Sequence, residues 1–451
     1  MSYVQVPPDG AGKKIHTKSN VISGTALETQ VMHIACATNP ESHLAIDNRG
    51  SASVRFAEGQ PIMSAFGSLK TSTERVVGVY ESSLDTYDAL FTTVTTLGGE
   101  KVYDPDQSSE VYRVSGDSGS RIWAATNRYH YYLPGSSNLI KMTVSCGDTG
   151  KNGNRRMWGA FDQHDGVFFD LNGSSLGVVI RSSTSGSVVE TRIPRELWNY
   201  DKLDGTGTSG VDLDITKIQV WWIDYQWLGA GRVRFGIFEP SGGRIVCHQF
   251  ENAGQNALPY MRTGTLPLRI ENVNTGITGS SSEIRAVCLS VYTEGTYEDY
   301  AFWRYADIDR TAVPVTDPNT VLFCMRAKSQ INDEHNSVII YPETLNVYAD
   351  QPIAITIWQD ASFISGTWQD LSSAGTVCYD CVIDNAEAQR FKTIYVQPGA
   401  TSIDLDKYFE KNDEGVQTNA DGSAEVWAIT ATRLTANATT ASVNLGYKEL
   451  W

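Results

Sequence analysis

Residues 218–238 carry the pattern that most constrains how this chain can fold. Two runs of alternating apolar and polar residues flank Gly229-Ala230-Gly231, which predicts a β-hairpin with a three-residue loop. If Leu228 pairs with Arg232, counting outward along both strands separates two faces. The apolar face then holds core-type side chains: Trp221, Ile223, Tyr225, Trp227, Val233, Phe235 and Ile237. The other face is polar and holds Asp224, Gln226, Arg232 and Arg234, flanked by Trp222 and Phe238.

A sheet with one apolar and one polar face is typical of a β-sandwich or jelly roll, whereas a doubly wound nucleotide-binding sheet is apolar on both faces. Similar strand-like runs recur at short intervals, for example at Arg75–Tyr80, Asn138–Val144 and Leu176–Arg181. Clusters of Gly, Ser, Asn and Asp separate them. Pro194–Asn199 is the one convincing helical turn. The sequence therefore predicts an all-β protein.

The length of 451 residues suits two or three domains rather than one ordinary sandwich. Residues 1–60 are expected to form an extended attachment arm, because polar segments surround a single strand candidate, Gln30–Ala35. Residues 61–300 are expected to form the central jelly roll. After a linker-like stretch at Thr311–Pro318, residues 315–451 are expected to form a smaller β-sandwich with five clear strand candidates.

The charge of the chain limits its partners. The net charge is −16 and the pI is near 4.9, with no long basic run, so we expect no nucleic-acid partner. No apolar run approaches the roughly 18 residues that span a bilayer, so we expect no membrane insertion. The first ten residues lack the basic and apolar regions of a signal peptide, which predicts synthesis in a cytoplasm.

Carboxylates are frequent, but their spacing selects no catalytic pair. Asp162, Asp165, Asp170 and Asp224 are candidates for glycoside hydrolysis, which needs two carboxyl groups at a defined separation. The chain also lacks the G-x-S-x-G turn of serine hydrolases, and its seven histidines show no i, i+4 pair for a metal. We therefore predict that the protein is not an enzyme and binds no cofactor.

Two segments could in principle bind a metal ion. Asp201, Asp204, Asp212 and Asp214 lie in a glycine-rich loop, and such oxygen ligands suit calcium. Their spacing is not that of an EF-hand, and a turn with solvated acids explains the same residues. The Cys378–Cys381 pair has CxxC spacing, but no second ligand pair for zinc accompanies it, so we interpret both cysteines as strand or turn residues.

The polar face of the hairpin is the main candidate for a binding site. Trp222, Asp224, Gln226, Arg232 and Arg234 could bind a sugar, whose ring would stack on an aromatic side chain while its hydroxyls form hydrogen bonds. The alternative is an Asp–Arg network on an outer sheet, covered by a loop or by another subunit.

The chain resembles virion proteins of large bacteriophages, particularly myophages, at framework positions over its first 300 residues. The segments that carry the resemblance are rich in glycine, proline and aromatic residues: Pro7–Lys14, Ile46–Gly59, Phe66–Gly67, Arg128–Gly135, Gly159–Asp162, Asp224–Gly236, Pro259–Met261 and Leu266–Arg269. The resemblance implies a structural virion protein with a central concanavalin-like jelly roll. It brings no catalytic residues with it.

The resemblance implies a non-enzymatic role in the virion, as a tail or baseplate adaptor or a fibre component. The alternatives are a capsid decoration or head fibre protein, and a carbohydrate-binding adhesin that contacts host-surface glycan; a glycan depolymerase is a third class. The expected partners are other virion proteins and copies of the chain itself, with a trimer expected from the habits of virion appendages. The expected place of synthesis is the host cytoplasm.

Overall fold

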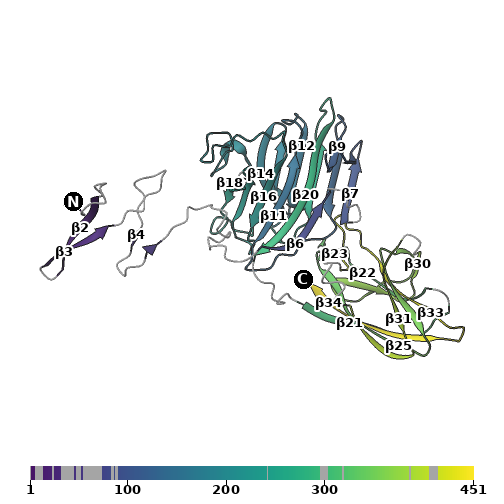
Figure 1. Cartoon of the computed structure of the whole chain (residues 1–451). Helices are drawn as coiled ribbons and strands as arrows, with labels where there is room; N and C mark the ends of the chain where they lie inside the picture. The colour runs from purple at the N-terminus through teal and green to yellow at the C-terminus, as the bar shows by residue number, and fades with distance from the viewer. Residues whose placement is uncertain are drawn as a thin grey trace. The chain divides into compact units, whose positions relative to one another are not determined.

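The computed structural model describes residues 2–5, 14–22, 25–31, 45–46, 52–53, 74–82, 86, 90–240, 242–294, 303–316, 319–384, 388–405 and 415–450. Regular structure in these ranges is almost entirely β, and none of them contains an α-helix (Figure 1), which confirms the all-β prediction. The helical turn expected at Pro194–Asn199 is the short 3-10 helix η2 (Arg195–Leu197), which Pro194 precedes. No helix in these ranges has the length and apolar character needed to cross a bilayer.

The chain divides into two compact units, residues 1–58 and 59–451. In the first unit, β1 (Ser2–Gln5), β2 (Lys14–Ile22) and β3 (Thr25–Val31) form an antiparallel three-stranded sheet. A short pair, β4 (Ala45–Ile46) and β5 (Ala52–Ser53), follows. The sequence predicted one strand here, at Gln30–Ala35, so the segment has more strand structure than expected of an extended arm.

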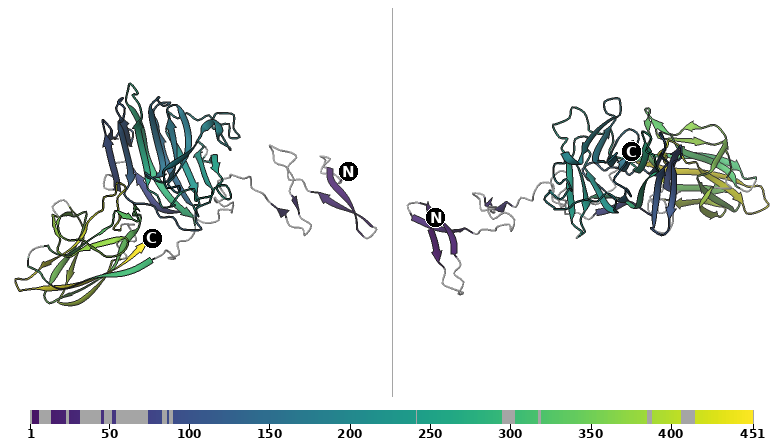
Figure 2. Two further views of the ribbon diagram at one scale, coloured as in Figure 1. Left: turned by 180° about the vertical axis from the view of Figure 1, so that it is seen from behind. Right: turned by 90° about the horizontal axis from the view of Figure 1, so that it is seen from above.

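The jelly roll in the second unit is built from two antiparallel sheets, which can be followed from two directions in Figure 2. The strands of the first sheet are β7 (Phe91–Thr96), β10 (Arg121–Thr126), β12 (Asn154–Phe161), β13 (Gly166–Asn172), β14 (Ser175–Ser182), β15 (Val189–Pro194) and β19 (Leu268–Asn274). Their order is β15-β14-β13-β12-β19-β10-β7.

The second sheet of the jelly roll has eight strands. They are β6 (Glu74–Glu81), β8 (Glu100–Asp104), β9 (Ser109–Val114), β11 (Asn138–Ser145), β16 (Gln219–Tyr225), β17 (Val233–Phe238), β18 (Arg244–Phe250) and β20 (Ser282–Glu294). Seven follow the order β18-β17-β16-β11-β20-β9-β8, and β6 pairs with β20.

Aromatic side chains from both sheets meet in the core of the jelly roll. Trp158 and Phe169 of the first sheet contact Trp221 of the second, with ring centroids 5.1 and 4.8 Å from that of Trp221. Phe169 also contacts Phe235 edge-to-face at 5.2 Å. Because all four rings are buried, the apolar face predicted for the hairpin is the inner face of a sandwich.

The hairpin itself forms with its predicted faces but in a different register. Tyr225 pairs with Val233, and the Gln226 N–H donates to the Arg232 carbonyl at 3.3 Å, whereas the predicted partner of Arg232 was Leu228. The Gly231 N–H closes the longer turn by donating to the Trp227 carbonyl at 2.9 Å. A shift of two residues keeps every side chain on its predicted face, because side chains alternate with a period of two.

The C-terminal sandwich also consists of two sheets. The four-stranded sheet contains β21 (Trp303–Pro314), β34 (Thr440–Leu450), β25 (Ile339–Ala349) and β32 (Gly399–Asp404), in that order. The six-stranded sheet contains β28 (Gln369–Asp370), β29 (Gly375–Cys378), β22 (Thr320–Ala327), β33 (Trp427–Arg433), β26 (Ile353–Gln359) and β31 (Gln389–Val396), in that order. Two small ladders join β23 (Gln330–Ile331) to β24 (Glu334–His335) and β27 (Ser362–Ser365) to β30 (Val382–Asp384).

The linker expected at Thr311–Pro318 is in part a strand. Residues 303–314 form β21, an edge strand that pairs with β34 across a bulge between Arg310 and Val313. Pro314 is tolerated because it ends an edge strand, where no neighbour needs its missing N–H. The pattern looked like a linker because the bulge and the proline interrupt the alternation of the strand.

Candidate functional site

The polar face predicted as a binding surface is closed in the structure. Asp224 and Arg234 pair directly across β16 and β17, and their side chains are 1% and 0% exposed. The Arg234 Nε donates to Asp224 Oδ1 at 3.0 Å, and Arg234 Nη2 lies 2.5 Å from Oδ2. Trp222 is buried beside them and donates through Nε1 to the Ile237 carbonyl at 3.0 Å. Trp222 packs with Leu139 and Val246 in a small apolar cluster, which Tyr200, Phe238 and Tyr292 border.

The other two predicted residues of this face also have structural contacts. Gln226 is buried, and its Nε2 donates to the Gly135 carbonyl at 3.0 Å. Arg232 is half-buried at the end of the hairpin turn. Because Trp222, Asp224 and Arg234 are all buried, they offer no open surface to a sugar.

The acidic loop considered for calcium uses its carboxylates as turn caps. Asp201 accepts from the N–H groups of Leu203 and Ser209, both at 2.8 Å. Asp204 and Asp214 each accept from the threonine two residues later, and Asp212 is 81% exposed. In the described part of the chain, no three His, Cys, Asp or Glu side chains are grouped so that they could hold a metal ion.

Cys378 and Cys381 lie in a small buried cluster with Cys324 and Trp358. All three thiols are free. Burial raises the pKa of the Cys378 thiol to about 12, so this thiol stays protonated at neutral pH. The cluster contributes to packing in the C-terminal sandwich.

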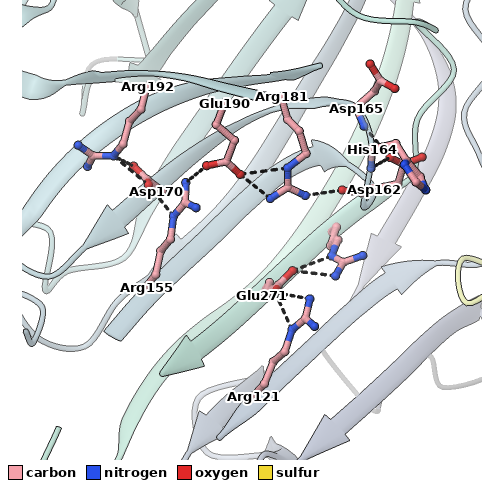
Figure 3. A network of polar contacts seen from close by, with 11 residues as sticks. Arg121, Arg155, Asp162, His164, Asp165, Asp170, Arg181, Glu190, Arg192 and Glu271 are labelled. Carbon is pink, nitrogen blue, oxygen red and sulfur yellow. Dashed lines mark hydrogen bonds and ion pairs between the residues drawn. The ribbon is translucent and has the colours of Figure 1, made fainter. Parts of the chain in front are cut away.

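The outward face of the seven-stranded sheet carries a lattice of ion pairs (Figure 3). Asp170 is fully buried and accepts from Arg155 and Arg192, each through Nε at 2.9 Å. Burial by itself raises the pKa of Glu190, but hydrogen bonds from Arg155 and Arg181 outweigh it and leave the pKa below its usual value. Two further arginines hold Glu271: Arg121 and Arg269, each at 2.7 Å.

The guanidinium groups of this lattice also cover aromatic rings. Arg269 lies 4.1 Å from the centroid of the Trp123 ring, and Arg181 lies 5.0 Å from that of Phe168. At the end of this sheet, Asp162 caps its own turn, accepting from the N–H groups of His164 and Asp165 at 2.7 and 2.8 Å. Asp165 accepts from the Ser183 hydroxyl at 2.7 Å. The acids considered for glycoside hydrolysis are therefore held in structural hydrogen bonds.

A cavity of about 530 Å³ in the jelly roll is a further candidate site. It lies between β14, β15 and the segment 250–260 that follows β18. A cavity of this size falls in the usual range for small-ligand sites. Its lining is mostly neutral: the hydroxyls of Ser182, Thr184, Ser185 and Thr191, the amides of Asn252, Gln255 and Asn256, and apolar surface from Phe250 and Leu258.

The turn of the β16–β17 hairpin positions one wall of this cavity. The Gly231 carbonyl accepts from Asn252 Nδ2 at 2.8 Å, and the Gly229 carbonyl accepts from the Tyr260 N–H at 2.9 Å. Gly229 has a φ of +72°, a conformation that glycine adopts without strain. From the opposite wall, the Thr184 hydroxyl donates to the Pro259 carbonyl at 3.0 Å. The segment is thus held at both ends.

The chemistry of this lining suits a polyhydroxylated ligand. Asn256 and Gln255 are exposed amides, which can donate and accept hydrogen bonds at once, as sugar hydroxyls require. Leu258 is 51% exposed and offers apolar surface to the C–H face of a ring. Glu251 is the one carboxylate in the lining, and burial raises the pKa of the Tyr260 phenol, which therefore stays neutral. The lining favours binding over acid–base chemistry, which needs two matched titratable groups.

Sequence reasoning missed this cavity, although it pointed to the hairpin that supports it. The segment 251–260 reads as a polar loop, and it is held in place by contacts with residues distant in sequence: the Gly229 and Gly231 carbonyls and the Thr184 hydroxyl. The sequence signal that could have indicated the cavity is the group of amide side chains at Asn252, Gln255 and Asn256, close to the aromatic Phe250.

No protein-family model and no curated protein matches this chain. Solved structures with a similar fold include the metal-free carbohydrate recognition domain of Emp46p, with 11% identity and a TM-score of 0.32 over 49% of this chain and 98% of that one. A legume lectin-like domain from Entamoeba histolytica has 11% identity and a TM-score of 0.30 over 49% and 98%. The CBM2 module of the evolved Dit of Lactobacillus casei BL23 phage J-1 has 8% identity and a TM-score of 0.32 over 50% and 99%. Identities this low transfer neither a ligand nor an activity to this chain.

Proposed function

We propose that this chain is a non-enzymatic, glycan-binding component of a bacteriophage virion, and that its jelly roll binds a neutral sugar in the cavity between β14, β15 and residues 250–260. The glycan-binding part rests on one observation, the neutral lining of hydroxyls, amides and apolar surface in a cavity of about 530 Å³. The virion part rests on the resemblance of the sequence to myophage virion proteins. A tail or baseplate adaptor, a fibre, a capsid decoration and a head fibre all suit such a protein.

In this proposal each wall of the cavity has a distinct role. The Gln255 and Asn256 amides bind sugar hydroxyls, while the Asn252 amide fixes the loop through its bond to Gly231 and through its Oδ1, which accepts from Asn256 Nδ2 at 3.1 Å. Leu258 and Phe250 contact the apolar face of the ring. A ligand bound in this way is recognised by its hydroxyl pattern and not by charge.

A glycan array followed by calorimetry with the full-length chain tests the binding. The double variant Gln255→Ala/Asn256→Ala should weaken binding by about tenfold or more, because it removes at least one net hydrogen bond to the sugar. Gln107→Ala removes a glutamine that is also exposed on the jelly roll, at the β8–β9 turn, and should leave binding unchanged. If no sugar binds saturably, or if the double variant binds as well as the wild type, the cavity is not a glycan site.

The non-enzymatic part is tested separately. Incubation of the chain with host polysaccharide should release no reducing ends, whereas a depolymerase would release them steadily. Antibody labelling of particles, or density at a defined position, tests the virion location and distinguishes head, tail and baseplate.

Assembly in this proposal is homo-oligomeric, with a trimer expected, and it depends on the first unit. The order β1-β2-β3 leaves two edge strands, and an edge strand can pair with another chain. Deletion of residues 1–55 should leave both sandwiches folded yet prevent incorporation into particles. Normal incorporation of the truncated chain would show that this unit is not the anchor.

A further inference from the structure

The four-stranded sheet of the C-terminal sandwich has one face toward the core and one face outward. Ile308, Leu345, Val443 and Leu445 are all buried in the core of this sandwich. The residues that alternate with them therefore point outward. On β21, β34, β25 and β32 these include Tyr305, Asp307, Asp309, Ser442, Asn444, Gly446, Lys448, Thr344, Asn346, Tyr348, Ala400, Ser402 and Asp404. We call this set the outer polar face.

A ladder of hydrogen bonds crosses the outer polar face. Asn444 pairs in register with Asp309 on one side and with Asn346 on the other. The Asn444 Nδ2 donates to Asp309 Oδ1 at 2.7 Å, and the Asn346 Nδ2 donates to Asn444 Oδ1 at 3.1 Å. The ladder fixes the amides in one orientation. Asp309 and Asn346 are exposed, so the remaining polar atoms of the ladder face solvent.

A shallow cavity of about 420 Å³ lies on this face, over the ladder. Its floor is formed by short side chains, including Ser442, Asn444 and Asn346, and Tyr348 stands at its side with 55% of its surface exposed. An exposed tyrosine ring offers both a stacking surface and a hydroxyl, and a tyrosine loses little conformational entropy when it is fixed by a ligand. The face thus combines a rigid polar floor with an aromatic wall.

We propose that the outer polar face is a second glycan-binding site and that it takes a neutral oligosaccharide. The charges decide the class of glycan. The exposed charged members of the outer polar face are Asp307, Asp309 and Asp404. Its one basic member, Lys448, is only 2% exposed and lies 3.9 Å from the Glu343 carboxylate. Uronic acids, sulfates and phosphates would be repelled there, whereas neutral hydroxyls can donate to the carboxylates and to the amide oxygens.

The dimensions of the face favour an oligosaccharide over a monosaccharide. Tyr348 pairs with Ser442, and a second exposed tyrosine, Tyr305, pairs with Lys448 on the same strand, β34. Six residues of strand separate these two positions, which is roughly 20 Å at about 3.3 Å per residue. The Gly446 position between them carries no side chain, so a chain of sugars can lie close to the sheet.

The second site does not depend on the cavity in the jelly roll. Two glycan sites on one chain would add avidity on a surface that presents many copies of the same glycan, because the second contact is intramolecular. The experiment therefore uses the full-length Gln255→Ala/Asn256→Ala chain, in which binding to the cavity of the jelly roll is expected to be at least about tenfold weaker. The probe is an array of neutral and uronic-acid-containing oligosaccharides, followed by calorimetry with the neutral oligosaccharide that binds best.

In this background Tyr348→Ala should weaken binding by about tenfold, the loss expected for one aromatic contact. Tyr348→Phe keeps the ring and should stay within about twofold of the background chain. Tyr395→Ala removes a tyrosine that is 71% exposed on β31, in the other sheet of the same sandwich, and should change nothing. Unchanged far-UV circular dichroism shows that each variant is folded.

Three results would overturn the proposal. The first is a background chain that binds no neutral oligosaccharide, and the second is binding that Tyr348→Ala leaves intact. The third is a chain that dimerises in sedimentation equilibrium and that Tyr348→Ala makes monomeric without any glycan binding, because the face would then be covered by a second copy. Failure of the jelly-roll site gives a different pattern: the wild type and the background chain would bind equally, and both would lose binding with Tyr348→Ala.

Discussion

The buried pair of Asp224 and Arg234 allows a quantitative test of the closed hairpin face. Replacing Arg234 with Met removes the guanidinium that pairs with the Asp224 carboxylate, which is 1% exposed. Breaking a buried ion pair in this way costs about 3–5 kcal/mol. For a sandwich of this size, a loss of about 4 kcal/mol lowers the midpoint of thermal unfolding by roughly 10 °C. Calorimetry and urea denaturation of the full-length chain measure both quantities.

The double variant Asp224→Leu/Arg234→Met completes the test. Asp224 pairs with Leu139 on the neighbouring strand, and Trp222 and Val246 lie in the same apolar cluster, so apolar replacements fit this surrounding. The double variant should recover about 2 kcal/mol or more of the loss, because no buried charge is left unpaired. Lys217→Met is the control. Lys217 forms an ion pair with Asp214, and because the two side chains are 78% and 50% exposed, this pair should contribute less than about 1 kcal/mol to the free energy of unfolding. If Arg234→Met costs no more than Lys217→Met, the face is solvated and the reasoning fails.

Other predictions concern packing, pH and metal ions. Gly236→Ala should cost about 3 kcal/mol in urea denaturation, because an added methyl would overlap the Ile245 carbonyl oxygen and the ring of Trp222; a loss below about 1 kcal/mol would contradict this packing. Burial lowers the pKa of His130 to about 3. Below about pH 6.5 this histidine is protonated in the unfolded chain but stays neutral in the folded chain, so the free energy of unfolding decreases as the pH drops from about 6.5 toward about 3. Between pH 7 and 4.5, His130→Gln should therefore lose about 2 kcal/mol less stability than the wild type, and equal losses would refute this role. Calcium and EDTA should both leave the unfolding midpoint unchanged, because turn N–H groups already occupy Asp201; a calcium-dependent rise would show that the acidic loop binds the ion.

The sequence predicted the faces of strands well and their exact partners less well. Alternation placed Trp221, Ile223 and Phe235 in the core, because the side-chain period of two is a local property. The predicted pairing register of the hairpin was wrong by two residues. The turn is closed by the hydrogen bond from the Gly231 N–H to the Trp227 carbonyl, and the amino-acid composition of the loop does not reveal that bond. The polar face was recognised as a face, but the alternation does not reveal that Trp222, Asp224 and Arg234 are buried on it.

The two candidate sites likewise depend on contacts that local sequence patterns do not predict. Asn252 reaches Gly231 across 21 positions of sequence, and Asn444 meets Asp309 across 135. Local patterns predict that Asn346 and Tyr348 lie on one side of a strand, but not that β34 lies between β21 and β25. Strand order across a sandwich is decided by packing of the whole core, which no short segment contains.

The strand orders of the jelly roll bear on how the chain folds during synthesis. β19 lies between β12 and β10, and β20 lies between β11 and β9, so the middle of each sheet is filled by strands that come last in this domain. Between Phe91 at the start of β7 and Glu294 at the end of β20, a ribosome needs on the order of 10–40 s at typical elongation rates. From the synthesis of each strand until residue 294 is added, the inner faces of β12 and β16, with Trp158 and Trp221, have no completed sheet to cover them. Until residue 294 has left the exit tunnel, these apolar faces stay exposed in the nascent chain and favour aggregation.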